Sequence, residues 1–396
     1  MKEKQWKGIQ EAIRTGRNDA RLYEFLKRKY SRLHIMEYGG TTFPNAIFVA
    51  PPKQRDHVDS VLDKPVLKEA PEDMLSEISQ SGQAYLNELR KTPANPWDGT
   101  TYRMLNIHDE DGNLKISCGL GSYFNMLKSS ETLELELLRE FAQRSPSNAV
   151  FDWFDKQLIL RRRLESYVSD SVKHGSGRSA AVSVSALTMF QMDRGGYKAL
   201  IWERSSDKVS IYTDILHVLP SGMLQPLVDD FDNEYSVEHN VYREYLEEVF
   251  NVEEVRRSGG HATYDYFYEN PNLLYLKDLI KDNKAKILLT GIAVDLLDLR
   301  PEICVLILIQ TTEWFENHSR GKKVGDLQLK SLEFVDEFKH RDELHAKGIR
   351  GTQLLELSDD LILPSGYLKP ENFTPQGAAA LLLGLQVARD VLRDDP

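Results

Sequence analysis

Apolar residues near the start of the chain recur at close to helical spacing. They lie among many charged residues between Lys7 and Leu33, and this pattern predicts a helix. The stretch from Tyr38 to Pro52 is rich in Gly, Pro and Thr and interrupts the pattern. A second helix is predicted over Glu72–Leu89, before a segment punctuated by proline and glycine. We therefore predict a mainly helical N-terminal region over residues 1–95.

The next segment changes to the alternation that is typical of short strands. Two apolar runs, Thr101–Ile107 and Leu114–Leu120, flank the acidic turn Asp109–Gly112, which indicates a β-hairpin. Helical spacing returns over Glu131–Phe141. These elements predict a small α+β module over residues 96–148.

Strand patterns dominate the remainder, which we predict to be one domain over residues 149–396. Runs rich in Val, Ile and Leu predict strands over 180–189, 197–203 and 212–219, and two more over 285–297 and 303–310. Pro375–Leu392 reads as an amphipathic helix with Thr374 as its cap. Because strands and helices intermix, the predicted fold class is α/β or α+β.

Composition and charge limit the classes of partner. The 396 residues carry a formal charge of −11, which argues against a surface built to hold a polyanion. Residues 1–32 are an exception, with ten Lys or Arg against four Asp or Glu, and a nucleic-acid partner would have to use this basic helix. A solvated helix face is the favoured interpretation of that excess. A homodimer is also compatible with the sequence.

The cellular compartment is expected to be the cytoplasm. The two cysteines, Cys118 and Cys304, lie in apolar runs and do not suggest a disulfide framework. The N-terminus is charged and lacks a signal-peptide pattern, and no apolar run approaches the roughly 20 residues of a membrane span. We therefore expect no association with a membrane.

One segment carries candidate chemistry. A strand ending at Pro220 is followed by Gly222, an acidic loop, and a helix that starts near Ser236 and stops near Asn251. In this helix Glu244, Glu247 and Glu248 stand at i, i+3 and i+4, which places three carboxylates on one helical face. Hard carboxylate oxygens suit Mg²⁺ or Mn²⁺, because these cations also bind substrate phosphates. The acidic helix is thus a candidate metal site for hydrolysis of a phosphoanhydride.

This segment resembles the Nudix box. Leu219–Gly222 matches the strand end that precedes the box, and Arg243–Glu248 matches the Arg-Glu-apolar-x-Glu-Glu core of its helix. The resemblance implies a Nudix-type α/β/α sandwich with a mixed sheet. It also implies divalent-metal-dependent hydrolysis of a nucleoside diphosphate linked to another group, with a nucleotide-type small molecule as the substrate.

By the same resemblance, Glu247 and Glu248 are the principal metal ligands. Glu244 is a further ligand or a base, and Arg243 orients the carboxylates. Gly222 and Arg204, the latter at the end of the 197–203 strand, are the implied substrate-binding residues. The aromatic run Tyr264–Tyr268 has two interpretations, stacking on a nucleobase or packing, of which packing is favoured.

The segment also departs from the family pattern. Gly222 and Arg243 are 21 positions apart instead of 14, so the acidic loop is longer by seven residues. The upstream family glutamate falls on Tyr235, and Glu234 or Glu238 is its candidate replacement, with Glu234 assigned as a metal ligand. The closing glycine falls on Phe250.

Two functions fit these departures: a diverged hydrolase, or a Nudix-like domain that binds a nucleotide without cleaving it. The retained carboxylates and arginine favour the hydrolase. A purely structural subunit is a weaker alternative.

Overall fold

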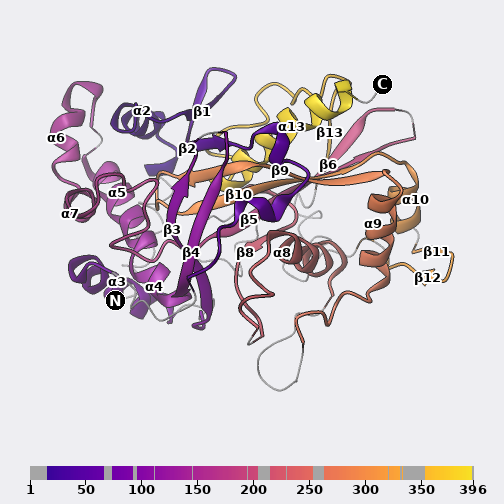
Figure 1. Ribbon diagram of the computed structural model, residues 1–396. Coiled ribbons are helices and arrows are strands. Elements are labelled where there is room, and N and C mark those ends of the chain that lie inside the picture. Colours follow the sequence, from indigo (N-terminus) through magenta and orange to yellow (C-terminus); the bar gives the residue numbers. More distant parts are fainter. Residues whose placement is uncertain are drawn as a thin grey trace.

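The computed structural model describes most of the chain, and its centre is a single curved sheet (Figure 1). The described residues are 16–66, 74–91, 96–110, 112–144, 146–193, 195–203, 215–228, 230–252, 263–319, 321–330, 332 and 353–394.

Among the described residues, the main sheet contains nine strands from distant parts of the sequence. Seven follow one another in the order β1-β2-β9-β10-β5-β6-β13, while β7 pairs with β6 and β8 pairs with β5. Strands β10 and β5 run parallel, and every other pairing in this sheet is antiparallel. The predicted α/β class with a mixed sheet is therefore confirmed. The strand bounds are β1 (Ile35–Tyr38), β2 (Thr41–Val49), β5 (Ser183–Gln191), β6 (Tyr197–Glu203), β7 (Leu216–Val218), β8 (Ser221–Met223), β9 (Ala285–Asp295), β10 (Pro301–Ile309) and β13 (Gln353–Glu356).

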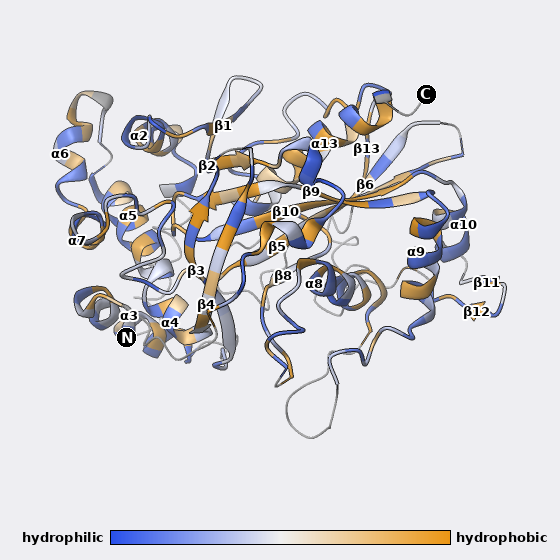
Figure 2. Ribbon diagram, in the orientation of Figure 1, coloured by the Kyte–Doolittle hydropathy of each residue, from blue (hydrophilic) through white to orange (hydrophobic). Residues whose placement is uncertain are grey.

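The central strands β9 and β10 are buried on both faces. Every residue of β10 is buried, which explains its unbroken apolar sequence. Successive side chains of a strand point to opposite faces, so Ile303, Val305 and Ile307 enter one core while Cys304 and Leu306 enter the other. In Figure 2 the apolar residues accordingly follow these strands and the helix faces turned toward them.

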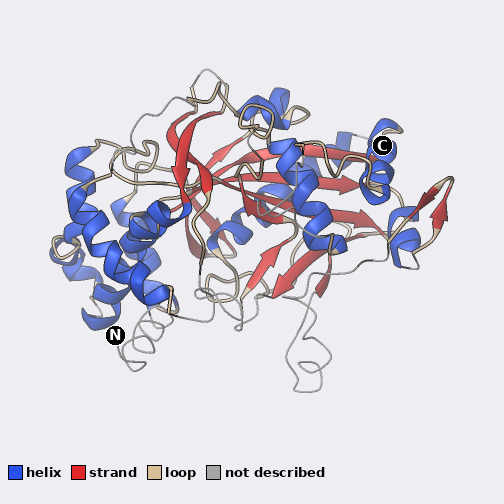
Figure 3. Cartoon of the chain, turned by 90° about the horizontal axis from the view of Figure 1, so that it is seen from below, coloured by secondary structure: helices blue, strands red, loops and turns tan. Residues whose placement is uncertain are grey.

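Helices cover both faces of the sheet (Figures 1 and 3). On one face lies α13 (Pro375–Asp394), which packs on β9, β10 and β5. Its predicted cap is confirmed, because the Thr374 hydroxyl accepts a hydrogen bond of 3.0 Å from the Gly377 N–H. On the other face lie α8 (Val237–Glu244), α9 (Pro271–Lys281) and α10 (Glu313–Ser319). No helix in the described ranges is long and apolar enough to cross a membrane.

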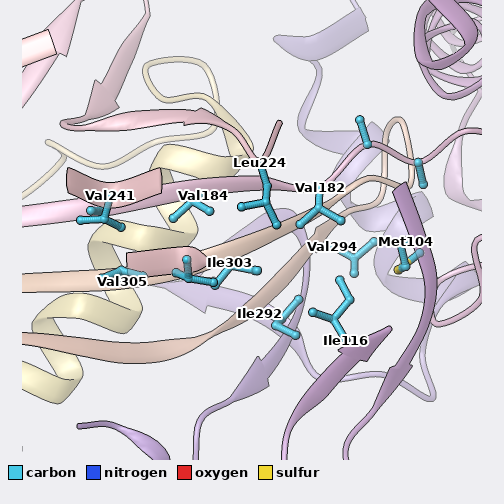
Figure 4. Packing of buried hydrophobic residues seen from close by; sticks show 14 of the residues in the cluster. Met104, Ile116, Val182, Val184, Leu224, Val241, Ile292, Val294, Ile303 and Val305 are labelled. Atoms are coloured by element: carbon cyan, nitrogen blue, oxygen red, sulfur yellow. The ribbon is translucent and has the colours of Figure 1, made fainter. Parts of the chain in front are cut away.

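The predicted hairpin is confirmed and packs on one end of the sheet. It consists of β3 (Thr100–His108) and β4 (Lys115–Ser122). Backbone hydrogen bonds join Tyr102 and Met104 of β3 to the chain just before β5. Figure 4 shows Met104 and Ile116 beside Val294 of β9, in the same core as Val182.

A group of helices lies beside the hairpin, next to the sheet's end. It includes the expected helix near residues 131–141, observed as α5 (Ser130–Arg144). The others are α2 (Ala20–Lys29), α3 (Ser76–Leu89), α4 (Tyr123–Lys128), α6 (Phe151–Asp155) and α7 (Ile159–Tyr167).

The sequence pattern misplaced one part of the N-terminal region. Residues 38–52 were expected only to interrupt helices, but they contain β2 and the end of β1. Gly39 and Gly40 have positive φ and make the turn between these strands. Strand β2 pairs with β9, so long-range pairing overrides the local Gly and Pro signal. The predicted domain boundaries stay predictions, although the region 1–95 contributes two strands to the main sheet.

Two buried arginines bind the turn between β9 and β10. Arg161 donates to the carbonyls of Leu296, at 3.0 Å, and Leu297. Arg178 donates to the carbonyl of Leu299 at 2.8 Å, and Leu299 itself has a positive φ. Both guanidinium groups are almost completely buried. Because buried carbonyls need donors, these arginines tie the segment before β5 to the centre of the sheet.

We expect Arg161→Ala to lower the free energy of unfolding by about 3 kcal/mol, because it leaves two buried carbonyls and the Tyr30 hydroxyl without this donor. Urea denaturation followed by circular dichroism measures the change. The matched control is the exposed neighbour Arg162→Ala, for which we expect a change within about 0.5 kcal/mol. Equal effects of the two variants would contradict the role of Arg161.

Candidate functional site

The acidic helix follows two short strands at one end of β5. Strands β7 and β8 flank the Leu219–Pro220 step, and α8 begins after a loop. The predicted cap is confirmed, because the Ser236 hydroxyl accepts a hydrogen bond of 3.0 Å from the His239 N–H. The predicted stop is also confirmed, because Asn251 has a φ of 49°. The local helix signals were therefore sufficient to find both ends.

The helix differs from the prediction in its last turn. It is α-helical over α8 and continues as a π-helix, η4 (Tyr245–Val249). Glu247 and Glu248 lie in this wider turn, whereas Glu244 closes the α-helical part. The prediction of one regular α-helix was thus wrong, and the simple i, i+3, i+4 geometry does not apply. Single π-turns inside helices often occur at functional sites.

Arg243 anchors the helix to the chain that follows β8. Its guanidinium donates to the carbonyls of Gln225, at 3.1 Å, and Met223, at 3.3 Å, and to Oε1 of Glu244, at 3.0 Å. Its side chain is only 2% exposed. Burial alone would lower the pKa of Arg243, but the carboxylates of Glu244 and Glu247 raise it above its usual value. Arg243 therefore stays charged and holds its neighbours in place.

Two of the three helix carboxylates contact β8. Glu248 accepts a hydrogen bond of 2.6 Å from the Ser221 N–H. The Glu244 carboxylate lies against Gly222 so closely that a methyl group there would overlap it. A methyl group at position 222 would therefore displace the end of the Glu244 side chain, which is a structural reason for glycine at this position. The structure brings the predicted residues Gly222, Arg243, Glu244 and Glu248 together.

The carboxylate chemistry suits a hard divalent cation, but the described conformation is not a closed metal cluster. Glu244, Glu247 and Glu248 are all half-buried, and Oε1 of Glu247 is completely buried. Within the described ranges, no group of three or more His, Cys, Asp or Glu side chains converges closely enough to hold a metal ion. Oε2 of Glu248 accepts a hydrogen bond from the Ser221 amide and Oε1 of Glu244 accepts one from Arg243, so a cation would compete with these donors for the two carboxylates.

The two candidates for the upstream carboxylate differ in their surroundings. Glu234 is buried and accepts hydrogen bonds from the N–H groups of Leu227 and Val228, so it closes the acidic loop. Glu238 is exposed on α8 and accepts a hydrogen bond of 3.0 Å from the Tyr242 hydroxyl. The assignment of Glu234 as a metal ligand stays a prediction. The hydrogen bonds observed for Glu234 stabilise the acidic loop.

Asp59, from the N-terminal region, is a positioning residue that sequence analysis missed. Its Oδ1 accepts hydrogen bonds from the N–H groups of Val237, at 2.6 Å, and Glu238, at 3.1 Å. Its other oxygen accepts a hydrogen bond from the Ser236 hydroxyl. A carboxylate at a helix N-terminus satisfies free N–H groups and interacts favourably with the helix dipole. No local pattern could reveal this contact, because it spans about 180 residues of sequence.

Two candidates remain, Arg204 and the aromatic run Tyr264–Tyr268. Arg204 lies outside the described residues. In the aromatic run, Phe267 and Tyr268 stack with ring centroids 4.8 Å apart, and Phe267 also packs on His239 of α8. Lys277 of α9 lies over the Tyr268 ring. This run therefore packs against α8, as the favoured interpretation expected.

Comparisons with known proteins add no family assignment. No family model matches this chain, and no curated protein matches it significantly.

We expect Gly222→Ala to destabilise the protein by about 1–3 kcal/mol, because the new methyl group displaces the Glu244 carboxylate and disturbs Arg243. Thermal and urea unfolding measure the change. Gly119→Ala in β4 is the control, since a methyl group there meets its neighbours at an ordinary 3.5 Å. In a Glu244→Ala background the cost of Gly222→Ala should fall, and an unchanged cost would contradict the predicted clash.

We expect Asp59→Ala to lower the free energy of unfolding by about 1 kcal/mol, because it removes the acceptor for two N–H groups of α8. Hydrogen exchange at Val237 and Glu238 should accelerate as well. Asp56→Ala, an exposed aspartate nearby, serves as the control and should change neither quantity. Unchanged exchange in Asp59→Ala would show that the contact does not hold the helix.

Proposed function

We propose that this protein is a Nudix-type hydrolase that cleaves a phosphoanhydride in a nucleoside diphosphate linked to another group. The observation that carries the proposal is the buried Arg243, which joins the acidic helix to β8 and places Glu244 and Glu248 against Gly222 and Ser221. A glycine-containing strand end beside an Arg-Glu-x-x-Glu-Glu helix is the arrangement that the Nudix resemblance implies. The Nudix-type sandwich is part of the same proposal, supported by helices on both faces of a mixed sheet.

Each residue of the acidic helix has a proposed role in metal binding or positioning. Glu247 and Glu248 supply oxygen ligands for Mg²⁺ or Mn²⁺, and Glu244 acts as a further ligand or as a base. Arg243 is a positioning residue, since its donors are used on Glu244 and two backbone carbonyls. When bound, the cation would neutralise phosphate charge and lower the pKa of a water molecule. Gly222 and Arg204 are the proposed contacts of the nucleotide.

Enzymatic activity is tested by product formation. The purified full chain is incubated with Mg²⁺ and ADP-ribose, NAD, dinucleoside polyphosphates or nucleoside triphosphates. We expect cleavage of one class, loss of activity with a chelator, and a rate at least about 100-fold lower in Glu247→Gln and Glu248→Gln. Glu269→Gln, an exposed glutamate away from the acidic helix, is the control and should retain activity. Cleavage that is independent of Glu247 and metal would overturn the proposal.

A second candidate function is nucleotide binding without cleavage. One observation favours it: in the described conformation Glu248 is bonded to the Ser221 amide and Glu244 to Arg243. The same panel separates the two functions. Saturable binding that survives the Glu247→Gln, Glu248→Gln double change, with no turnover by the parent protein, would favour a sensor over a hydrolase.

A further inference from the structure

A cleft lies between α2, α6 and α7. Its residues are distant in sequence from the acidic helix. These helices are grouped at the left edge of Figure 1. The cleft has a volume of about 430 Å³, and Phe25 and Phe151 form its apolar part. Its charged lining consists of Arg28, Lys29, Asp152, Asp155, Lys156 and Arg162. This volume is within the usual range for sites that bind small molecules.

The lining of this cleft is positive, whereas the chain as a whole is negative. Four cationic side chains line the cleft with two carboxylates, and Glu165, which pairs with Lys29, is a third carboxylate, so the excess is one positive charge (4 − 3). The whole chain has a formal charge of −11. Local positive charge of this kind attracts anions even when the net charge of a protein repels them.

Two of the cations are held in place by ion pairs. Lys29 pairs with Asp155 at 2.5 Å and with Glu165 at 2.9 Å, and its side chain is only 11% exposed. Burial alone would lower the pKa of Lys29, but Tyr30, Glu165 and Asp155 raise it, so the amine stays charged. Arg28 pairs with Asp152 at 2.8 Å. These ion pairs neutralise Arg28 and Lys29, so the positive charge that the cleft offers to a ligand comes from its other two cations.

The other two cations have no such partner. Lys156 follows α6 and Arg162 lies on α7, and both are exposed. Neither forms an ion pair within the described ranges. An arginine presents a fork of N–H donors that matches a phosphate or carboxylate, and a lysine adds a compact charge. Lys156 and Arg162 are thus available to a ligand that enters the cleft.

We propose that this cleft binds a phosphate group, with Lys156 and Arg162 as its principal contacts. The two lining cations without an ion pair in the described ranges, Lys156 and Arg162, match the two negative charges of a phosphate dianion. A single compact group is favoured over a nucleic-acid backbone, because Asp152, 81% exposed in its side chain, would repel a continuous row of phosphates. The group belongs either to a small soluble phosphate or to the headgroup of a lipid. The proposal is independent of the proposed hydrolase, since no residue is shared.

Equilibrium dialysis of the full chain with labelled pyrophosphate tests the site. A chelator is present, so that metal-dependent binding at the acidic helix is suppressed. We expect saturable binding that weakens at least about tenfold in the Lys156→Glu, Arg162→Glu double variant. The control is Lys281→Glu, Lys323→Glu, which changes the net charge equally at two exposed lysines elsewhere. Glu247→Gln should bind like the parent, which separates this site from the proposed active site.

The same variants are assayed for sedimentation with vesicles of phosphatidylcholine, with and without phosphatidic acid. Loss of vesicle binding in the cleft variant alone would assign the site to a lipid headgroup, and loss of pyrophosphate binding alone would assign it to a soluble phosphate. Circular dichroism spectra establish that each variant is folded. If neither probe binds the parent, or if the cleft variant and the control weaken binding equally, the proposal is wrong.

Discussion

Burial of β9 and β10 on both faces is the constraint on which the rest of this structure depends. The two strands are joined by a turn whose carbonyls are also buried and therefore need donors. Arg161 and Arg178 supply them from the segment that precedes β5. The helical group, the sheet and the start of the strand-rich half thus form one connected core, in which the β3–β4 hairpin covers the sheet's end. Strand β5 pairs with both β10 and β8, and so connects this core to the strand that precedes the acidic helix.

The candidate site likewise depends on a buried arginine, Arg243, whose guanidinium is hydrogen-bonded to neighbouring groups. Removing Arg243 from water is costly unless it has partners, and two carbonyls and Glu244 accept hydrogen bonds from its terminal nitrogens. This requirement fixes the helix against β8 before any ligand is present. It also gives a reason for glycine at position 222, where a methyl group would displace the Glu244 carboxylate. The backbone of the site is therefore held in place, and Glu248 on the π-helical turn is hydrogen-bonded to the Ser221 amide.

Position along the sequence is a poor guide to role in this molecule. Asp59 caps the acidic helix from a segment that was expected to belong to a separate helical region. Strand β2 enlarges the sheet that carries the candidate site. The cleft between α2, α6 and α7 combines residues 25–29 with residues 151–162. In each case two segments that are distant in sequence together form a feature that one segment could not form alone.

The sequence by itself determined the elements whose signals are local. The hairpin turn, the Ser236 and Thr374 caps and the Asn251 stop were all predictable, because they depend on hydrogen bonds and φ angles within a few residues. The periodicity of buried strands also gave the α/β class. Tertiary structure alone decided that residues 41–49 form a strand, that the last helical turn widens, and that Asp59 reaches the acidic helix. These features depend on pairing and packing between segments far apart in the chain, where no local propensity can act.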